Sequence, residues 1–272
     1  MIGVDNRIDR LFAENNTKKF IPFLTVGDPN IDVTFELVHA LVEAGSDLIE
    51  LGIPYSDPLA DGPTIQRASQ RALANRIAIR DALSLVARLR ESGITIPLVI
   101  FTYFNPVLQY GVHQFFRDLA EYGADGAIIP DLPVEEADEA SQAAVETGTH
   151  LIPLVAPTSE HRIKLIADKA RGFIYCVSSL GVTGARSSLS ADLDQFLGKV
   201  RESTTLPLAV GFGISTAEQV KTVAAHVDGV VVGSAIVQEI ERNLPLLTDS
   251  SKKTEGIENV KRFVKSLSGA LK

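Results

Sequence analysis

Short apolar segments alternate with amphipathic segments along the whole chain, and this alternation restricts the possible folds more than any other feature. Eight of the apolar runs are nearly continuous in hydrophobic residues, which is typical of parallel strands covered on both faces. We expect these strands at residues 20–25, 47–51, 98–102, 126–129, 150–154, 172–177, 208–210 and 229–232.

The intervening segments carry hydrophobic residues at helical spacing, and several of them stop at a glycine, a common helix terminator. We expect helices at 32–44, 79–92, 112–122, 134–147, 159–170, 193–202, 216–225 and 255–267, with an extra N-terminal helix at 8–12. Eight successive βα units predict an α/β fold closed into a (β/α)8 or TIM barrel. A doubly wound open sheet is the alternative.

No linker or shift in composition divides the chain, so we expect residues 1–272 to form a single barrel domain. The net charge of −8, without a run of Lys or Arg, argues against nucleic acid and anionic membranes as partners. Cys176 is the one cysteine, which excludes an internal disulfide and favours a reducing, cytoplasmic setting. The sequence contains neither a membrane-spanning apolar run nor an opening signal peptide, which agrees with that setting.

Two carboxylates, Glu50 and Asp61, stand in unusual places. Glu50 interrupts an apolar strand near its end, and Asp61 follows in a loop rich in Pro, Gly and Asp. A buried carboxylate is costly unless it is paired, neutralised or used, and its shifted pKa suits proton transfer. Two acids in different surroundings can divide proton transfer and charge stabilisation between them. The alternative is a salt bridge at the base of the loop, because Arg67 and Arg71 follow closely.

Glycines follow three successive strands in the second half of the chain. Gly181 and Gly184 come after the sixth strand, Gly213 after the seventh, and Gly233 with Ser234 after the eighth. Glycine lets backbone N–H groups approach an anion, and a helix that starts at Ser234 would add its positive end. Phosphate sites of such barrels recur after the seventh and eighth strands, so we predict a phosphate cradle rather than plain tight turns.

Hydrophobic side chains at or just past the strand ends would line the mouth of the barrel. Aromatic groups in this position could hold a flat ring, although packing inside the barrel is the alternative for each of them. The candidates are Phe23, Phe101, Ile128, Tyr175 and Phe212. The five histidines lie apart without the spacing of metal ligands, so we expect no metal site.

Seven motifs resemble one family over the whole chain and in order. The sequence is similar to the tryptophan synthase alpha subunit family, the indole-3-glycerol-phosphate aldolases. The matching stretches are Pro22–Pro29, Glu50–Pro63, Pro130–Glu136, Ala156–Ser159, Gly181–Arg186, Gly211–Ser215 and Gly233–Val237. The resemblance implies a carbon–carbon lyase of tryptophan biosynthesis that cleaves indole-3-glycerol phosphate to indole and glyceraldehyde 3-phosphate in a retro-aldol step.

The resemblance also implies a role for each matching residue. Glu50 would be the acid–base group that protonates the indole ring carbon and helps remove the side-chain hydroxyl proton. Asp61 would accept a hydrogen bond from the indole N–H and stabilise the cationic intermediate. Thr183 would position Asp61 when the loop that holds Thr183 closes over the substrate. Tyr175 would line the site near Glu50. The remaining residues would bind substrate, the indole being packed by Phe23, Phe101, Ile128 and Phe212 and the phosphate being held by Gly184, Gly213, Gly233 and Ser234.

The resemblance further implies a partner and leaves other functions open. A PLP-dependent beta subunit would receive the indole in an αββα heterotetramer, and this chain would carry no cofactor of its own. Docking would involve the loop at 54–58, with Asp57, and the loop after the sixth strand, where many bacterial members carry a basic residue in place of Ser179 or Leu180. The alternatives are a free-standing lyase that releases indole, a non-catalytic regulatory subunit, and another phosphate-binding barrel.

Overall fold

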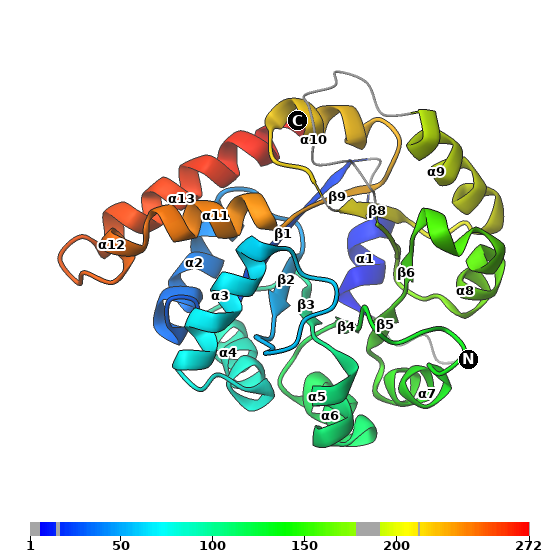
Figure 1. The fold of residues 1–272 in the computed structure, drawn as a ribbon, viewed down its shortest axis with the longest axis horizontal. Helices are drawn as coiled ribbons and strands as arrows, with labels where there is room; N and C mark the ends of the chain where they lie inside the picture. Colours follow the sequence, from blue (N-terminus) through cyan, green and yellow to red (C-terminus); the bar gives the residue numbers. More distant parts are fainter. Residues whose placement is uncertain (1–5, 15–16, 178–190, 212, 272) are drawn as a thin grey trace.

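A computed structural model describes residues 6–14, 17–177, 191–211 and 213–271. Its strands form one all-parallel sheet in the order β5-β4-β3-β2-β1-β9-β8-β7-β6. The strands are β1 (Lys19–Thr25), β2 (Ile49–Gly52), β3 (Leu98–Phe101), β4 (Gly126–Ile128), β5 (His150–Ile152), β6 (Leu154–Val155), β7 (Ile174–Val177), β8 (Leu208–Gly211) and β9 (Gly229–Val232). The sheet is wrapped into a barrel with helices around it (Figure 1), which confirms the predicted fold class.

The barrel closes within the predicted fifth strand, which is divided in two. Pro153 separates β5 from β6, and these two short strands form the two ends of the sheet. A proline cannot donate a backbone hydrogen bond to a neighbouring strand, which explains the interruption. Its carbonyl oxygen still accepts the N–H of Tyr175 at 3.0 Å. One continuous segment therefore pairs with β4 on one side and with β7 on the other.

Helices follow most strands and cover the outside of the barrel. Besides the predicted helices, the structure contains three that the sequence analysis did not assign, namely α3, α5 and α12. The α-helices are α1 (Arg7–Ala13), α2 (Ile31–Glu43), α3 (Pro63–Ala74), α4 (Ile79–Glu91), α5 (Phe104–Tyr110), α6 (Val112–Glu121), α7 (Asp138–Thr147), α8 (Ile163–Lys169), α9 (Ala191–Ser203), α10 (Ala217–Ala224), α11 (Ser234–Arg242), α12 (Leu244–Leu247) and α13 (Lys253–Ser268). The short 3-10 helices are η1 (Pro157–Arg162) and η2 (Gly269–Leu271).

Two predicted helices begin four residues later than expected. The segment at 134–147 becomes helical only at Asp138, where Asp138 and Glu139 place negative charge in the first turn. The segment at 159–170 contains the end of η1 before α8 begins at Ile163. The predicted N-terminal helix is confirmed as α1.

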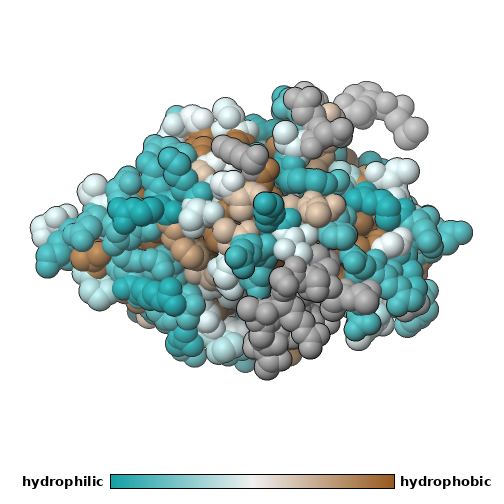
Figure 2. All heavy atoms as spheres, turned by 90° about the horizontal axis from the view of Figure 1, so that it is seen from above, coloured by the Kyte–Doolittle hydropathy of each residue, from teal (hydrophilic) through white to brown (hydrophobic). Residues whose placement is uncertain are grey.

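The side chains of each strand point alternately to the two faces of the sheet, which divides the core into an outer and an inner layer. Phe20 and Leu24 of β1 pack between the sheet and the helices, whereas Ile21 and Phe23 belong to the cluster inside the barrel. Successive side chains of a strand point to opposite faces, so both layers come from the same apolar runs. Figure 2 shows one face of the molecule, on which hydrophilic residues predominate and hydrophobic residues are visible between them.

Helix α1 lies at the amino-terminal end of the strands. The side-chain amide of Asn6 donates to the carbonyl oxygens of Asp125 and Gly148, which precede β4 and β5. Arg7 pairs with Asp125 at 2.9 Å. The opposite, carboxyl end of the strands is where barrels of this kind carry their chemistry. Among the described residues, no helix has the length and apolar character needed to cross a membrane.

Candidate active site

Glu50 lies inside the barrel, surrounded by apolar residues. Its neighbours Ile49 and Leu51 belong to the outer core layer, so alternation turns Glu50 inward. It is aligned with Phe23 of β1 and Val99 of β3, which both belong to the inner cluster. The side chain is 1% exposed, and its Oε1 finds no hydrogen-bond partner among the described residues.

The buried position of Glu50 changes its acidity. Removal from water penalises the carboxylate and raises the pKa of Glu50 to about 8. A carboxyl with such a pKa is mostly protonated near neutral pH and can both give and take a proton. The prediction that Glu50 is a buried acid with a shifted pKa therefore agrees with the structure.

Asp61 lies in the loop between β2 and α3 and reaches the same cavity as Glu50. Burial raises the pKa of Asp61, and a hydrogen bond with Tyr103 opposes that rise by favouring the ionised carboxylate. Among the residues that the structure describes, the alternative salt bridge is absent: Arg67 pairs with Glu241, and Arg71 pairs with Asp28 and Glu241. Glu50 and Asp61 thus occupy two different environments.

Tyr103 is a site residue that the sequence analysis missed. It follows β3, two residues after Phe101, and its hydroxyl accepts the N–H of Ala60 at 3.0 Å while hydrogen-bonding to Asp61. Its ring packs at 5.1 Å from that of Tyr55. The rule that singled out Phe101, an aromatic residue at a strand end, applies equally to Tyr103 and could have found it.

The two acids share a cavity of about 570 Å³ at the carboxyl end of the strands. Eight of the predicted site residues line it: Phe23, Glu50, Asp61, Phe101, Tyr175, Gly213, Gly233 and Ser234. Ile128 is fully buried in the inner cluster and is not part of this lining. Thr183, Gly184 and Phe212, with Ser179 and Leu180, lie outside the described residues.

Aromatic rings form one wall of the cavity. The rings of Phe23 and Phe101 meet edge to face, with centroids 5.6 Å apart. Tyr175 is buried beside Glu50, and burial, followed by the charge of Glu50, raises the pKa of its hydroxyl well above the usual value. Its ring lies over Gly211, where an added Cβ would come within 2.1 Å of the Tyr175 hydroxyl oxygen. A flat apolar group would fit against this wall.

A further part of the cavity lining, the phosphate end, combines glycines with a helix amino terminus and begins beside Phe23, since a Cβ at Gly233 would lie 3.5 Å from Phe23 Cβ. Gly213 has a φ of +77°, a conformation that other residues rarely adopt. Gly233 precedes α11, whose first residues Ser234 and Ala235 line the cavity. The N–H groups of a first helical turn attract anions, so this end suits a phosphate. Among the described residues, no cluster of His, Cys, Asp and Glu has the composition of a metal site.

Comparison with known proteins identifies the family. A family model described as "Tryptophan synthase alpha chain" matches residues 10–270. The chain is 52% identical to the tryptophan synthase alpha chain of Halalkalibacterium halodurans over 262 residues, which cover 96% of this chain and 99% of the relative. The chain belongs to the tryptophan synthase alpha chain family. This family cleaves indole-3-glycerol phosphate and works with a beta subunit.

Solved structures agree with the family assignment. A crystal structure of tryptophan synthase subunit alpha from Legionella pneumophila superposes with a TM-score of 0.88 at 37% identity, covering 98% of both chains. A structure of Mycobacterium tuberculosis tryptophan synthase gives a TM-score of 0.85 at 37% identity with the same coverage. The barrel therefore has a fold that these two structures share over nearly the full chain.

Proposed function

We propose that this chain cleaves indole-3-glycerol phosphate in the cavity between Glu50 and Asp61, with the aromatic wall holding the indole and α11 facing the phosphate. The observation that carries the proposal is the Glu50 carboxyl, buried at the cavity with a pKa raised to about 8. An apolar wall, an acid and an anion-attracting helix end match the three parts of this substrate.

Glu50 performs both proton transfers of the retro-aldol step. The protonated carboxyl gives its proton to the ring carbon that bears the glycerol chain. The resulting carboxylate then takes the proton of the adjacent chain hydroxyl, and the carbon–carbon bond breaks as that carbon becomes an aldehyde. The electrons of the broken bond return to the ring, which leaves as indole. A pKa between those of the two reacting groups lets one residue act in both directions.

Asp61 stabilises the positive charge that the ring acquires on protonation. Its carboxylate accepts a hydrogen bond from the indole N–H, and this hydrogen becomes more acidic as the ring becomes cationic. Tyr103 donates to the same carboxylate and keeps it ionised and oriented. The rings of Phe23, Phe101 and Tyr175 exclude water from the indole, and Ile128, aligned with Phe101 in the next strand, packs in the same inner cluster. Gly213, Gly233 and Ser234 hold the phosphate, and Thr183, Gly184 and Phe212 complete the same site.

The chain also passes its product to a partner. We infer an αββα heterotetramer in which a PLP-dependent beta subunit receives the indole, in a cytoplasmic enzyme whose alpha chain carries no cofactor. The β2–α3 loop supports a docking role, because Leu59 is 86% exposed there beside the site residue Asp61. Asp57 of the same loop is exposed and available to a basic group of the partner.

The experiment measures indole release from indole-3-glycerol phosphate by the purified chain, with and without a tryptophan synthase beta subunit. Slow release that rises many-fold with the beta subunit is expected, whereas fast release that is unaffected would establish a free-standing lyase.

Glu50→Gln tests the catalytic role of Glu50. It is expected to lower turnover by about 10²–10⁴-fold, the usual contribution of acid–base catalysis. Glu43→Gln, at an exposed carboxylate paired with Lys261, is the matched control. Near-normal turnover of Glu50→Gln would contradict the assignment.

A further inference from the structure

The position of Asp61 depends on helix α3. The helix begins at Pro63, two residues after Asp61, and the side-chain amide of Gln66 donates to the Asp61 carbonyl oxygen at 2.8 Å. Any displacement of α3 therefore carries the Asp61 main chain with it. The question is what holds α3 in place.

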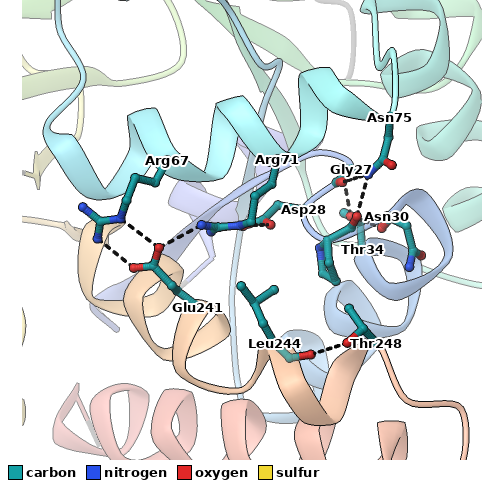
Figure 3. Close-up of polar contacts among 11 residues, drawn as sticks. Gly27, Asp28, Asn30, Thr34, Arg67, Arg71, Asn75, Glu241, Leu244 and Thr248 are labelled. Carbon is teal, nitrogen blue, oxygen red and sulfur yellow. Dashed lines mark hydrogen bonds and ion pairs between the residues drawn. The ribbon is translucent and has the colours of Figure 1, made fainter.

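Two arginines one helical turn apart on α3 converge on a single carboxylate of α11 (Figure 3). Arg67 donates from Nε and Nη2 to the two oxygens of Glu241 at 2.8 and 2.7 Å. Arg71 donates from Nη1 to Glu241 Oε1 at 2.8 Å. The shared acceptor ties α3 to the helix whose first turn faces the phosphate end of the cavity.

Arg71 also reaches in the opposite direction, into the loop after β1. Its Nε and Nη2 donate to the two oxygens of Asp28 at 2.7 and 2.8 Å. Asp28 is 2% exposed, so Arg71 is the group that compensates a buried charge. Asn75, at the end of α3, donates to the carbonyl oxygens of Gly27 and Pro29 in the same loop.

The network joins four side chains through five hydrogen bonds and differs in this from an isolated ion pair. An isolated surface ion pair contributes little, because its side chains remain mobile and solvated. Here the rigid guanidinium forks fix direction as well as distance, and Glu241 accepts from both of them. Positive and negative groups alternate from Asp28 through Arg71 and Glu241 to Arg67. The network therefore sets the orientation of α3 between the β1–α2 loop and α11.

We propose that Glu241 is a positioning residue for Asp61: through Arg67 and Arg71 it fixes α3 against α11 and sets where Asp61 stands relative to the phosphate end of the cavity. Because the substrate spans both ends, a small shift of α3 moves the Asp61 carboxylate away from the indole N–H while phosphate is bound. Misplacement by about 1 Å can cost up to about 10²-fold in rate. The inference rests on the proposed function, in which Asp61 stabilises the cationic ring.

The test is Glu241→Gln, which keeps the size of the side chain and removes its charge. Turnover of indole-3-glycerol phosphate is expected to fall about tenfold, whereas the Kd of glycerol 3-phosphate stays within about twofold of the parent value. Arg242→Gln is the matched control, because Arg242 is the next residue of α11, is exposed and pairs with Glu239 alone among the described residues. Its turnover is expected to equal that of the parent.

The same substitution in the Asp61→Asn variant distinguishes an effect on the position of Asp61 from a general loss of stability. In the Asp61→Asn chain, Glu241→Gln is expected to cause little further loss, because residues that act through one another are not additive. Arg67→Gln, which leaves the Asp28–Arg71 pair intact, should reproduce the loss of turnover if Glu241→Gln folds poorly. Unchanged turnover of both variants, or the same tenfold loss in the Asp61→Asn background, would overturn the inference. A parent chain that releases no indole would instead contradict the proposed function.

Discussion

The ring of Phe23 occupies the space that a side chain at Gly52 would need. A Cβ at residue 52 would lie 2.4 Å from Phe23 Cζ, because these residues belong to the ends of adjacent strands. Gly52→Ala should therefore push the Phe23 ring out of the aromatic wall. We expect a destabilisation of about 1–3 kcal/mol, as for other overpacked cores, and at least a tenfold loss in kcat/KM. Urea unfolding and steady-state kinetics measure the two effects.

Gly198→Ala is the control for this substitution. Gly198 lies within α9, and an added Cβ would meet nothing within 4 Å. The change should raise the free energy of unfolding by about 0.5–1 kcal/mol and leave activity unaltered. If Gly52→Ala retained full activity, the Phe23 ring would not be required for substrate binding.

The acidity of Glu50 predicts how stability depends on pH. In the unfolded chain Glu50 ionises near 4.5, whereas in the folded chain its pKa is raised to about 8. Protonated Glu50 therefore contributes its full stabilisation to the folded chain below pH 4.5. This contribution to the free energy of unfolding is lost as pH rises through about 8. Glu50→Gln removes this titration. Its free energy of unfolding should therefore increase relative to the parent over that range, by about 5 kcal/mol at most.

Denaturant unfolding at pH 5 and pH 8 measures this difference. The control Glu43→Gln alters a carboxyl whose pKa is lowered, chiefly by its hydrogen bond with Lys261, and so should show no such gain at pH 8. A constant difference between Glu50→Gln and the parent at both pH values would mean that Glu50 titrates normally in the folded chain.

The hydroxyl of Tyr103 should affect catalysis more than binding. Tyr103→Phe removes the donor to Asp61 and the acceptor of the Ala60 N–H. We expect a five- to twentyfold decrease in kcat, corresponding to about 1–2 kcal/mol for a hydrogen bond to a charged group, with a smaller change in KM. Tyr55→Phe, whose ring packs against Tyr103 and whose hydroxyl accepts from Asn105, is the control. Equal kcat values for the two variants would remove Tyr103 from the site.

The phosphate end can be tested at Gly213. Its φ of +77° makes Gly213→Val strained, and the added side chain would enter the cavity. We expect the Kd of glycerol 3-phosphate to rise at least tenfold in calorimetric titration. Gly93→Val introduces comparable strain at φ +96°, in an exposed turn after α4. Equal phosphate affinity of both variants would place the anion elsewhere.

The sequence predicted those features that depend on local patterning. Glu50 could be identified because it interrupts an apolar run, and strand alternation then required that it point into the barrel. The division of the fifth strand was visible in principle, since Pro153 lacks an N–H. Helix α3 was missed because the segment between β2 and β3 already contained the predicted helix at 79–92, and a βα unit is expected to carry one helix. Helix α5 was missed because Pro106 stands in its first turn, a position that tolerates proline.

Contacts between distant segments could not be predicted in the same way. The partnership of Tyr103 with Asp61 depends on the packing of the β2–α3 loop against the segment after β3. Glu241 and Arg71 are 170 residues apart, and both have the composition of ordinary exposed helix residues. No local pattern distinguishes such a pair from a solvated charge, which is why the positioning network emerged from the three-dimensional arrangement alone.

The attachment of α1 has a consequence for how the chain assembles during synthesis. Asn6 is translated 119 residues before Asp125 and 142 residues before Gly148, the two carbonyls that it binds. These two hydrogen bonds of Asn6 therefore cannot form until the segments that precede β4 and β5 have been made. Such long-range closure slows folding. Asn6 thus waits for both of its acceptors, and its two hydrogen bonds record that the first half of the barrel is in place.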